Sequence, residues 1–475
     1  MSKIDSPIKT ASEKFGDLLA IEDKQHAITF SELYKLVSSL SSRLKENNIQ
    51  ESTRVALYAE KSLQYIILLM ALWNIKAVAC PLSIRLPLDA IKKHLLHINC
   101  KVILTDKNYI ENDDLCVIDI FEIYNSITSD NNNLTVSLWD LAQDTTILFT
   151  SGSTSEPKPV LHTYGNHYFN ALGSNDNILL EPADRWLISL PLYHVGGLAI
   201  IFRCLLSGAT MVIDNDFLIA IEKYNITHLS LVTTQLQQLL VESESDISKR
   251  QLKAILLGGG PLNITNIKKA SDLGLNIFTS YGSTEMASQI TTTPVRTKLS
   301  KLYTSGKILK YRELKISDDN EILVKGKTRF RGYIDGDTIK YPFDNDGWYS
   351  TGDTGFVDDE GFLIVYGRKD NMFISGGENI YPEEIEQVIT SLIDIEECIV
   401  VPVEDTKFDY RPVVFIKNNK KILIDSNLLK SMLEEKLPRF KIPIHYFDWP
   451  DDINFSGVKP DRVKLKNRAI KLMMS

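Results

Sequence analysis

Short apolar runs alternate with longer helical patterns through most of the chain. Arg54–Ala59 predicts a strand, Ser62–Asn74 a helix, Ala77–Pro81 a strand and Leu88–His97 a helix. Alternation of this kind favours parallel sheets covered by helices, which bind ligands at the carboxyl ends of their strands. Further strand–helix pairs continue the pattern: Trp186–Leu190 with Gly197–Leu206, His228–Leu231 with Gln235–Val241, and Leu252–Leu257 with Ile264–Ala270.

The pattern changes after Gly367. Helical segments at Pro382–Ser391 and Asn427–Lys436 enclose two strands, Cys398–Val401 and Val413–Ile416. We therefore predict an α/β protein with a large N-terminal domain of layered parallel sheets and helices and a small C-terminal α+β domain. The predicted boundaries are residues 1–367, a short charged linker at 368–370, and residues 371–475.

Composition and charge exclude several classes of protein. The chain has 475 residues, 44% hydrophobic and 24% charged, which is too long for one compact core and unlike a disordered or fibrous protein. Its net charge of −8 argues against nucleic-acid binding and favours a soluble, cytoplasmic protein. Met1–Thr10 lacks the apolar core of a signal peptide. The most apolar run, Tyr65–Trp73, is shorter than a membrane span, so we expect a buried helix there.

The cysteines are scattered along the chain, with no Cys-x-x-Cys spacing. This distribution argues against disulfides and a structural zinc site. We expect reduced, mostly buried thiols at Cys80, Cys100, Cys116, Cys204 and Cys398.

A loop rich in hydroxyl side chains follows the apolar strand Thr146–Phe149. Hydroxyls and exposed backbone amides can hold phosphate oxygens, and a lysine can offset their charge. The Walker pattern Gly-x4-Gly-Lys-Ser/Thr is absent, and by itself the segment is equally compatible with an ordinary surface loop. The candidate phosphate-binding residues are Thr150, Ser151, Gly152, Ser153, Thr154 and Lys158.

Further motifs follow this loop in a fixed order. They are Tyr281-Gly-Ser-Thr-Glu285, Trp348-Tyr-Ser-Thr-Gly-Asp353, Gly367-Arg-Lys-Asp370, Ile374-Ser-Gly-Gly-Glu-Asn379 and Ser456-Gly-Val-Lys459. In this order and at these separations, from about Ala27 to Lys464, the chain resembles the adenylate-forming superfamily of acyl-CoA ligases, peptide-synthetase adenylation domains and luciferases. The resemblance implies activation of a carboxylic acid by ATP as an acyl-adenylate, followed by transfer of the acyl group to coenzyme A.

The resemblance also assigns the ATP and magnesium sites. The phosphate loop would hold the β- and γ-phosphates and Thr284 the α-phosphate. Glu285 would serve Mg²⁺, which prefers oxygen ligands. Glycines after a strand let the backbone approach a base closely. The adenosine residues would be Gly258, Gly259, Gly260, Tyr281 and Gly282 for the base, Asp353 for the ribose hydroxyls, and Arg368 for a ribose or phosphate contact.

The C-terminal motifs carry the remaining roles that the resemblance implies. Lys459 would be the catalytic lysine, because an ammonium between carboxylate and α-phosphate stabilises the charge of the transition state. The superfamily usually has Ser-Gly-Lys here, so Lys464 is a competitor, and Ser155 likewise replaces a usual glycine. Asp370 matches the hinge about which the small, mobile domain rotates. In its second pose, the loop of Ser375, Gly376 and Gly377 would line the coenzyme A tunnel.

Two stretches concern the acid. Pro191-Leu-Tyr-His-Val-Gly-Gly197 and Leu229-Ser-Leu-Val-Thr-Thr-Gln-Leu236 resemble the o-succinylbenzoate–CoA ligases of menaquinone and phylloquinone biosynthesis. That acid keeps a second carboxylate, which needs a partner when buried. Arg203, on an otherwise apolar helix, is the candidate partner, directly or through water; the alternative is an arginine that snorkels to the surface. The other predicted acyl-site residues are His194, which is alternatively a satisfied core histidine, Thr233, Ser280 and Tyr281.

Three alternatives stay open at this stage. One is a ligase for another aryl or medium-chain acid, and another is an adenylation enzyme that loads a carrier protein. The third is an inactive homologue that acts as a scaffold. We expect small-molecule partners only (ATP, an aromatic keto-dicarboxylic acid and coenzyme A), no nucleic acid and no membrane insertion. A homo-oligomer, common in the superfamily, is compatible with the sequence.

Overall fold

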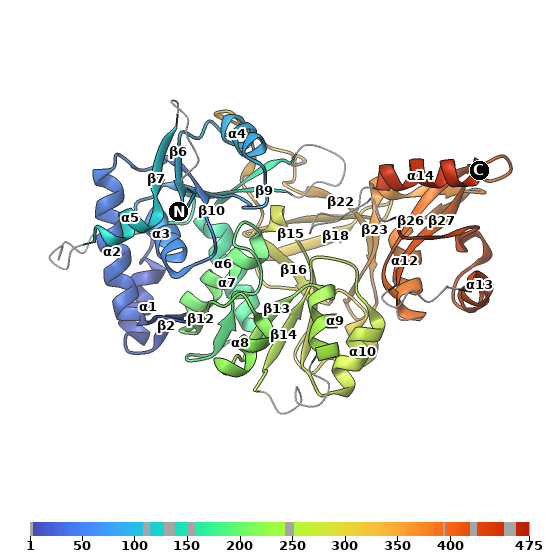
Figure 1. The fold of residues 1–475 in the computed structure, drawn as a ribbon, viewed down its shortest axis with the longest axis horizontal. Coiled ribbons are helices and arrows are strands. Elements are labelled where there is room, and N and C mark those ends of the chain that lie inside the picture. Colours follow the sequence, from blue (N-terminus) through green and yellow to red (C-terminus); the bar gives the residue numbers. More distant parts are fainter. Residues whose placement is uncertain are drawn as a thin grey trace.

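The computed structural model describes residues 3–107, 115–127, 138–150, 157–242, 251–392, 395–418, 425–450 and 462–474. Most of the chain forms one large body, and the elements from α12 onward lie together at one end of the long axis (Figure 1). The fold is the layered α/β architecture that the sequence predicts. Within the described part of the chain, no helix is long and apolar enough to cross a membrane.

The first large sheet has the strand order β21-β20-β10-β9-β5-β4-β6-β7 in the described residues. Strands β9, β5, β4, β6 and β7 are parallel, whereas the pairs β9–β10, β10–β20 and β20–β21 are antiparallel. Helix α4 packs Ile91 and Leu95 against one face. The bounds are β4 Arg54–Tyr58, β5 Val78–Pro81, α4 Leu88–His97, β6 Val102–Thr105, β7 Cys116–Asp119, β9 Asp144–Phe149, β10 Pro159–Thr163, β20 Gly332–Asp335 and β21 Thr338–Lys340.

The second large sheet has the order β17-β16-β15-β14-β13-β11-β12-β2-β3 among the described strands. Its central strands, β15 to β2 in this order, are parallel. Helices α8, α9 and α10 cover one face through a separate apolar core. The bounds are β2 Leu19–Glu22, β3 Ala27–Thr29, β11 Arg185–Leu187, β12 Thr210–Val212, α8 Phe217–Lys223, β13 His228–Leu231, α9 Thr233–Glu242, β14 Ala254–Leu257, α10 Ile264–Asp272, β15 Ile277–Ser283, β16 Ser288–Thr292 and β17 Lys307–Ile308.

The helices between the two large sheets share one core with both of them. Helix α3 is buried at every residue except Gln64, which confirms the expected buried helix and explains its apolar sequence. Helices α2 and α6 begin at capping boxes of Thr29 with Glu32 and Thr163 with Asn166, which satisfy the first backbone amides. The bounds are α1 Pro7–Phe15, α2 Phe30–Glu46, α3 Leu63–Asn74, α5 Ile120–Asn125, α6 Tyr164–Ile178 and α7 Val195–Ser207.

An antiparallel sheet of order β18-β19-β22-β23 follows the second large sheet in the chain, and the sequence pattern did not predict it. Strand β18 alternates exposed charged residues with buried or partly buried ones, so it lacks the continuous apolar run by which the parallel strands were recognised. The bounds are β18 Arg312–Ile316, β19 Glu321–Gly326, β22 Tyr349–Val357 and β23 Leu363–Arg368, and the smaller elements are β1 Lys3–Ile4, β8 Trp139–Asp140, η2 Thr284–Met286 and α11 Leu299–Leu302.

The C-terminal part forms its own sheet, β25-β24-β27-β26, with β28 beside β27. Alternate residues of β26 enter two cores: Val400 packs with α12 and α13 on one face, and Val401 packs with α14 on the other. All five cysteines lack disulfides and only Cys116 is exposed, as expected. The bounds are η3 Lys369–Asn371, β24 Phe373–Ser375, β25 Glu378–Ile380, α12 Pro382–Leu392, β26 Ile395–Asp405, β27 Asp409–Asn418, α13 Ser426–Glu434, η4 Arg439–Lys441, β28 Tyr446–Asp448 and α14 Arg462–Met474.

Candidate active site

The glycine loop after β14 and the tyrosine motif of β15 lie at the same edge of the second sheet. Because β14 and β15 are adjacent and parallel, their carboxyl ends meet there. Ser280 Oγ donates to Leu257 O at 3.1 Å, and a Cβ atom at Gly258 would lie 2.6 Å from Ser280 Oγ. The close approach therefore requires glycine. Thr233 Oγ1 donates to Pro261 O at 2.8 Å, which joins α9 to the same loop.

Tyr281, Asp353 and Arg368 form a connected polar group beside this edge. The Tyr281 hydroxyl donates to Asp353 Oδ2 at 2.6 Å, and Arg368 Nη1 lies 3.4 Å from Asp353 Oδ1. Burial and the Asp353 carboxylate raise the pKa of Tyr281, so its hydroxyl stays a donor. Arg368 also donates to Asp370 Oδ2 at 3.0 Å. The structure thus brings together the residues that the sequence predicted for adenosine.

The turn of Thr284 and Glu285 is held by residues that sequence reasoning missed. His162 Nε2 donates to Thr284 O at 2.7 Å, and burial lowers the pKa of this histidine to about 4, so it is neutral. Tyr333 donates to Glu285 Oε1 at 2.9 Å and contacts the Tyr349 hydroxyl at 2.8 Å. The available signal was weak: a histidine in the apolar strand β10, and two tyrosines that resemble core aromatics.

The base of the phosphate loop lies beside Glu285. Thr150 N donates to Lys158 O at 3.0 Å, and Lys158 N donates to Thr150 Oγ1 at 3.1 Å, so these two residues close the loop. Lys158 Nζ is 5.3 Å from the ring centroid of Tyr333, the tyrosine that contacts Glu285. The other predicted loop residues, Ser151, Gly152, Ser153 and Thr154, and the atypical Ser155 lie outside the described residues.

The carboxylate of Glu285 suits a magnesium ion that is shared with a nucleotide. No group of three or more His, Cys, Asp or Glu side chains able to hold a metal occurs in the described parts of the chain. Mg²⁺ is typically bound by one or two carboxylates together with substrate phosphates and water. A single glutamate next to a phosphate-binding loop fits that pattern.

Arg203 is completely buried, with 0% of its surface exposed, so the snorkelling alternative is wrong. Its Nη2 donates to Gln289 Oε1 at 2.8 Å, and its guanidinium lies 5.2 Å from the Trp186 ring centroid. Within the described residues, Nε and Nη1 have no partner and no carboxylate pairs with the side chain. Burial lowers the pKa of Arg203 to about 10, which leaves it charged at neutral pH.

Gln289 connects Arg203 to the nucleotide motif. In the antiparallel pair β15–β16, Gln289 lies opposite Gly282, the residue after Tyr281. A Cβ atom at Gly282 would overlap the backbone of Ser288, so the close pairing depends on glycine. One hydrogen-bonded side chain therefore separates the buried guanidinium from the strand that carries the Tyr281–Glu285 motif.

His194 is exposed at the N-terminus of α7, so it is not a core histidine. It lies nine positions before Arg203, or about 13 Å away along the helix axis. Its ring lies 4.7 Å from that of Tyr193. A contact between His194 and the acid stays a prediction.

The predicted coenzyme A loop is a hairpin of the C-terminal sheet. Gly376 and Gly377 have φ values of 57° and 88°, and Gly376 N donates to Phe408 O at 2.9 Å. Among the described contacts none joins this hairpin to Tyr281 or Asp353. Lys459 lies outside the described residues, and its competitor Lys464 is on α14.

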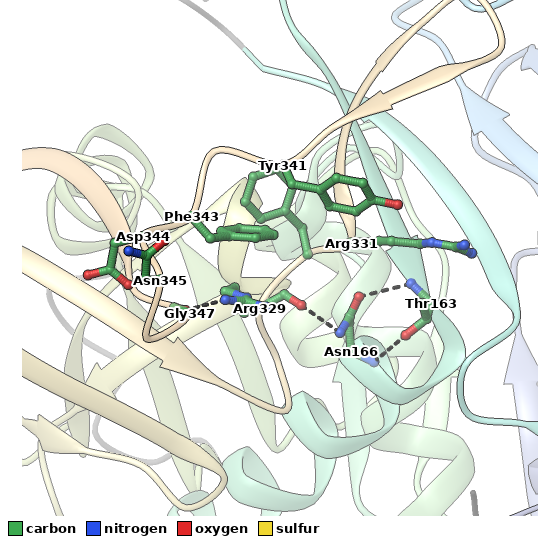
Figure 2. Close-up of a pocket in the computed structure, with 10 residues that line it drawn as sticks. Thr163, Asn166, Arg329, Arg331, Tyr341, Phe343, Asp344, Asn345 and Gly347 are labelled. Carbon is green, nitrogen blue, oxygen red and sulfur yellow. Dashed lines mark hydrogen bonds between the residues drawn. The ribbon is translucent and has the colours of Figure 1, made fainter.

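A cavity of about 520 Å³ lies elsewhere, at the N-terminal end of α6 (Figure 2). None of the predicted site residues lines it. Arg329 lies with its guanidinium 3.6 Å from the Phe343 ring centroid, and Asn166 Nδ2 donates to Arg329 O at 2.8 Å. Asn166 and Arg329 thus connect the start of α6 to the 341–347 loop, where Arg329 Nη1 donates to Gly347 O.

The fold and the family match define an AMP-binding enzyme with its candidate site at the carboxyl ends of parallel strands. The chain belongs to the AMP-binding enzyme family, whose model matches residues 8–334. The 2-succinylbenzoate–CoA ligase of Listeria innocua is 34% identical over 430 residues, covering 90% of each chain.

The o-succinylbenzoate CoA synthetase of Bacillus subtilis, solved with the acyl-adenylate intermediate OSB-AMP, has a TM-score of 0.88 at 29% identity, covering 98% of this chain and 99% of that one. The complex of that enzyme with ATP and a magnesium ion has a TM-score of 0.88 at 29% identity, covering 98% of this chain and 100% of that one. A double mutant of the same enzyme, bound to the product analogue OSB-NCoA, has a TM-score of 0.73 at 29% identity, covering 98% of this chain and 99% of that one.

Proposed function

We propose that this chain converts 2-succinylbenzoate to its coenzyme A thioester through an acyl-adenylate, releasing pyrophosphate and then AMP, as a cytoplasmic step of menaquinone biosynthesis. The observation that carries the proposal is Arg203, a fully buried cation with no carboxylate partner among the described residues, joined through Gln289 to the strand of the nucleotide motif. An unpaired buried charge is costly. The second carboxylate of 2-succinylbenzoate would neutralise it. The names of the similar Listeria and Bacillus enzymes support the same acid.

In the first half-reaction, the succinyl carboxylate attacks the α-phosphorus of ATP and pyrophosphate leaves. Both reactants are anionic, so the protein must fix their geometry and supply positive charge. Tyr281 and Asp353 would orient the adenosine, and Thr284 would bind the α-phosphate. Glu285, oriented by Tyr333, would hold Mg²⁺, which offsets the charge of the phosphate oxygens.

The phosphate loop from Thr150 to Lys158 and the lysine at 459 would supply the remaining charge at the phosphates. In the second half-reaction, the thiolate of coenzyme A attacks the acyl carbonyl carbon, the bond to the phosphate oxygen breaks and AMP leaves.

The two half-reactions require different domain poses, with residues 368–370 as the hinge between residues 1–367 and 371–475. Rotation at Asp370 would remove Lys459 and bring Ser375, Gly376 and Gly377 to the acyl group. The higher TM-score with the ATP complex than with the product-analogue complex of the same enzyme supports the adenylating pose for this structure.

Mass spectrometry of the thioester tests the proposal. Purified protein is mixed with ATP, Mg²⁺, coenzyme A and 2-succinylbenzoate, with benzoate and octanoate as control acids. We expect product from 2-succinylbenzoate only, and loss of adenylation in Lys459→Ala. Turnover of a control acid instead would refute the acid assignment. Pyrophosphate exchange without thioester would indicate loading of a carrier protein.

A further inference from the structure

A second buried arginine, Arg312, shares a hydrogen-bonding partner with Arg203. Arg312, on β18, is 6% exposed, and its three nitrogens donate to backbone carbonyls: Nε to Gln289 at 2.7 Å, Nη1 to Lys310 at 2.7 Å and Nη2 to Asn170 at 3.3 Å. Every acceptor is neutral. A Cβ atom at Gly173 would overlap Arg312 Nη1, so α6 leaves room for the guanidinium by having glycine there.

Gln289 contacts both guanidinium groups. Its side-chain Oε1 accepts from Arg203, and its backbone carbonyl accepts from Arg312. Its Nε2 donates to Thr292 Oγ1 at 2.6 Å, which fixes the orientation of the amide so that oxygen faces Arg203. Burial, and next the positive charge of Arg203, lower the pKa of Arg312 to about 9. The two cations are therefore close enough to repel each other.

The hydrogen bonds of Arg312 to backbone carbonyls hold its side chain in place, but they do not require a second positive charge beside Arg203. Packing alone is served as well or better by apolar side chains of similar volume, because a buried charge loses its hydration. Among the described residues no carboxylate compensates Arg203 or Arg312. Two like charges held together in a core, with no anion beside them in the described part of the chain, would favour the binding of an anionic group from outside.

We propose that Arg312 is a specificity-determining positioning residue: its charge, held behind Arg203 through Gln289, increases the affinity for acids with a second carboxylate without touching them. This inference rests on the proposed function. Arg203 keeps Nε and Nη1 available for the carboxylate, because Gln289 engages Nη2 alone. Each side-chain nitrogen of Arg312 already donates to a backbone carbonyl, so Arg312 acts on the substrate carboxylate through the electric field of its positive charge.

The test compares two acids that differ only in the ring carboxylate, 2-succinylbenzoate and 4-oxo-4-phenylbutanoate. A unit charge roughly 10 Å away in a partly polar interior changes anion binding on the order of tenfold. We expect Arg312→Gln to lower kcat/KM for 2-succinylbenzoate about tenfold through KM, and to change kcat/KM for the monocarboxylate and KM for ATP by less than about twofold. Arg312→Lys, which keeps the charge, should restore most of the loss. Arg329→Gln, a half-buried arginine at the cavity of Figure 2, is the matched control and should not change the ratio of the two acids.

Equal losses for both acids in Arg312→Gln, or no recovery in Arg312→Lys, would overturn the inference. Arg312→Met provides a second neutral variant if the glutamine variant does not fold. The proposed function fails differently: a wild-type enzyme that shows no preference for the dicarboxylate over the monocarboxylate refutes the acid assignment itself. A wild-type preference that Arg312→Gln leaves unchanged refutes only the role of Arg312.

Discussion

Replacing Arg203 by methionine should stabilise the protein while it damages acid binding. Burial lowers the pKa of Arg203 from its ordinary value of 12.5 to about 10. This shift corresponds to roughly 3 kcal/mol by which the charged side chain destabilises the folded state. Because the folded pKa is below the unfolded one, the penalty is complete below pH 10 and disappears only as the pH rises from 10 to 12.5. Loss of the Gln289 bond and the Trp186 contact offsets part of the gain, which leaves about 1–2 kcal/mol.

Differential scanning calorimetry at pH 7.5, without ligands, measures the change in the stability of the folded protein. For a chain of 475 residues, we expect Arg203→Met to raise Tm by roughly 1–2 °C. In the thioester assay, kcat/KM for 2-succinylbenzoate should fall by roughly 100-fold, because removal of one partner of a buried charge pair costs about 2–5 kcal/mol. KM for ATP should stay within about twofold, since the nucleotide residues are untouched.

Arg203→Lys separates charge from packing. It keeps a buried cation and therefore the desolvation cost, so its Tm should not rise above that of the wild type. A lower Tm for Arg203→Met together with an unchanged preference for 2-succinylbenzoate over 4-oxo-4-phenylbutanoate would refute the reasoning. Arg203 would then be a structural residue and not the partner of a substrate carboxylate.

Three further predictions concern other parts of the site. Glu285→Gln should raise the Mg²⁺ concentration for half-maximal ATP–pyrophosphate exchange at least roughly tenfold, and an unshifted titration would exclude this glutamate as the metal ligand. Burial lowers the pKa of His162 and His228 to about 4, so the unfolded chain binds more protons between pH 4 and 6.5. The free energy of unfolding, from urea titrations, should therefore fall by about 1.4 kcal/mol per pH unit for each histidine as the pH drops through that range, and a flat profile would contradict their burial as neutral groups. Lys369 Nζ lies 2.6 Å from an Asp319 carboxylate oxygen beside the proposed hinge, and this ion pair would stabilise the adenylating pose. Lys369→Ala should therefore increase the rate of the thioester step relative to adenylation about two- to threefold in single-turnover assays. An unchanged ratio of the two rates would argue that the ion pair does not stabilise the adenylating pose.

The strands and helices of the two large sheets were predictable because each has a clear apolar period. Helix α3 is apolar on every side and is buried on every side, and β4 is a continuous apolar run in the centre of a sheet. The four-stranded sheet after residue 311 was not predicted, since its strands mix charged and apolar positions. Motif positions were also predictable, because strand ends and glycine turns concentrate the ligand-binding groups.

The contacts that orient those groups were not predictable from a single sequence. Tyr333 meets Glu285 across 48 residues of sequence, and Gln289 meets Arg203 across 86. Such pairs depend on strand register and helix packing, which local patterns do not specify. Sequence reasoning singled out Arg203 because a charged residue interrupts an apolar helix, but it did not find Arg312. A charge on a strand that looks half-exposed carries no comparable signal.

Another largely buried arginine of this chain is paired with carboxylates of the protein itself. Arg462, at the start of α14, donates to Glu386 Oε1 at 2.6 Å and to Glu383 Oε1 at 3.3 Å. Burial lowers the pKa of Arg462, but the two carboxylates raise it further, to above the ordinary value for arginine. The contact between α12 and α14 thus contains a compensated charge. Arg203 and Arg312 have a different environment: they are more deeply buried, their acceptors among the described residues are neutral, and their pKa values are lowered. Among the described residues, two carboxylates compensate Arg462 and none compensates Arg203 or Arg312. This difference is the reason for the proposal that the second carboxylate of the substrate compensates the two arginines.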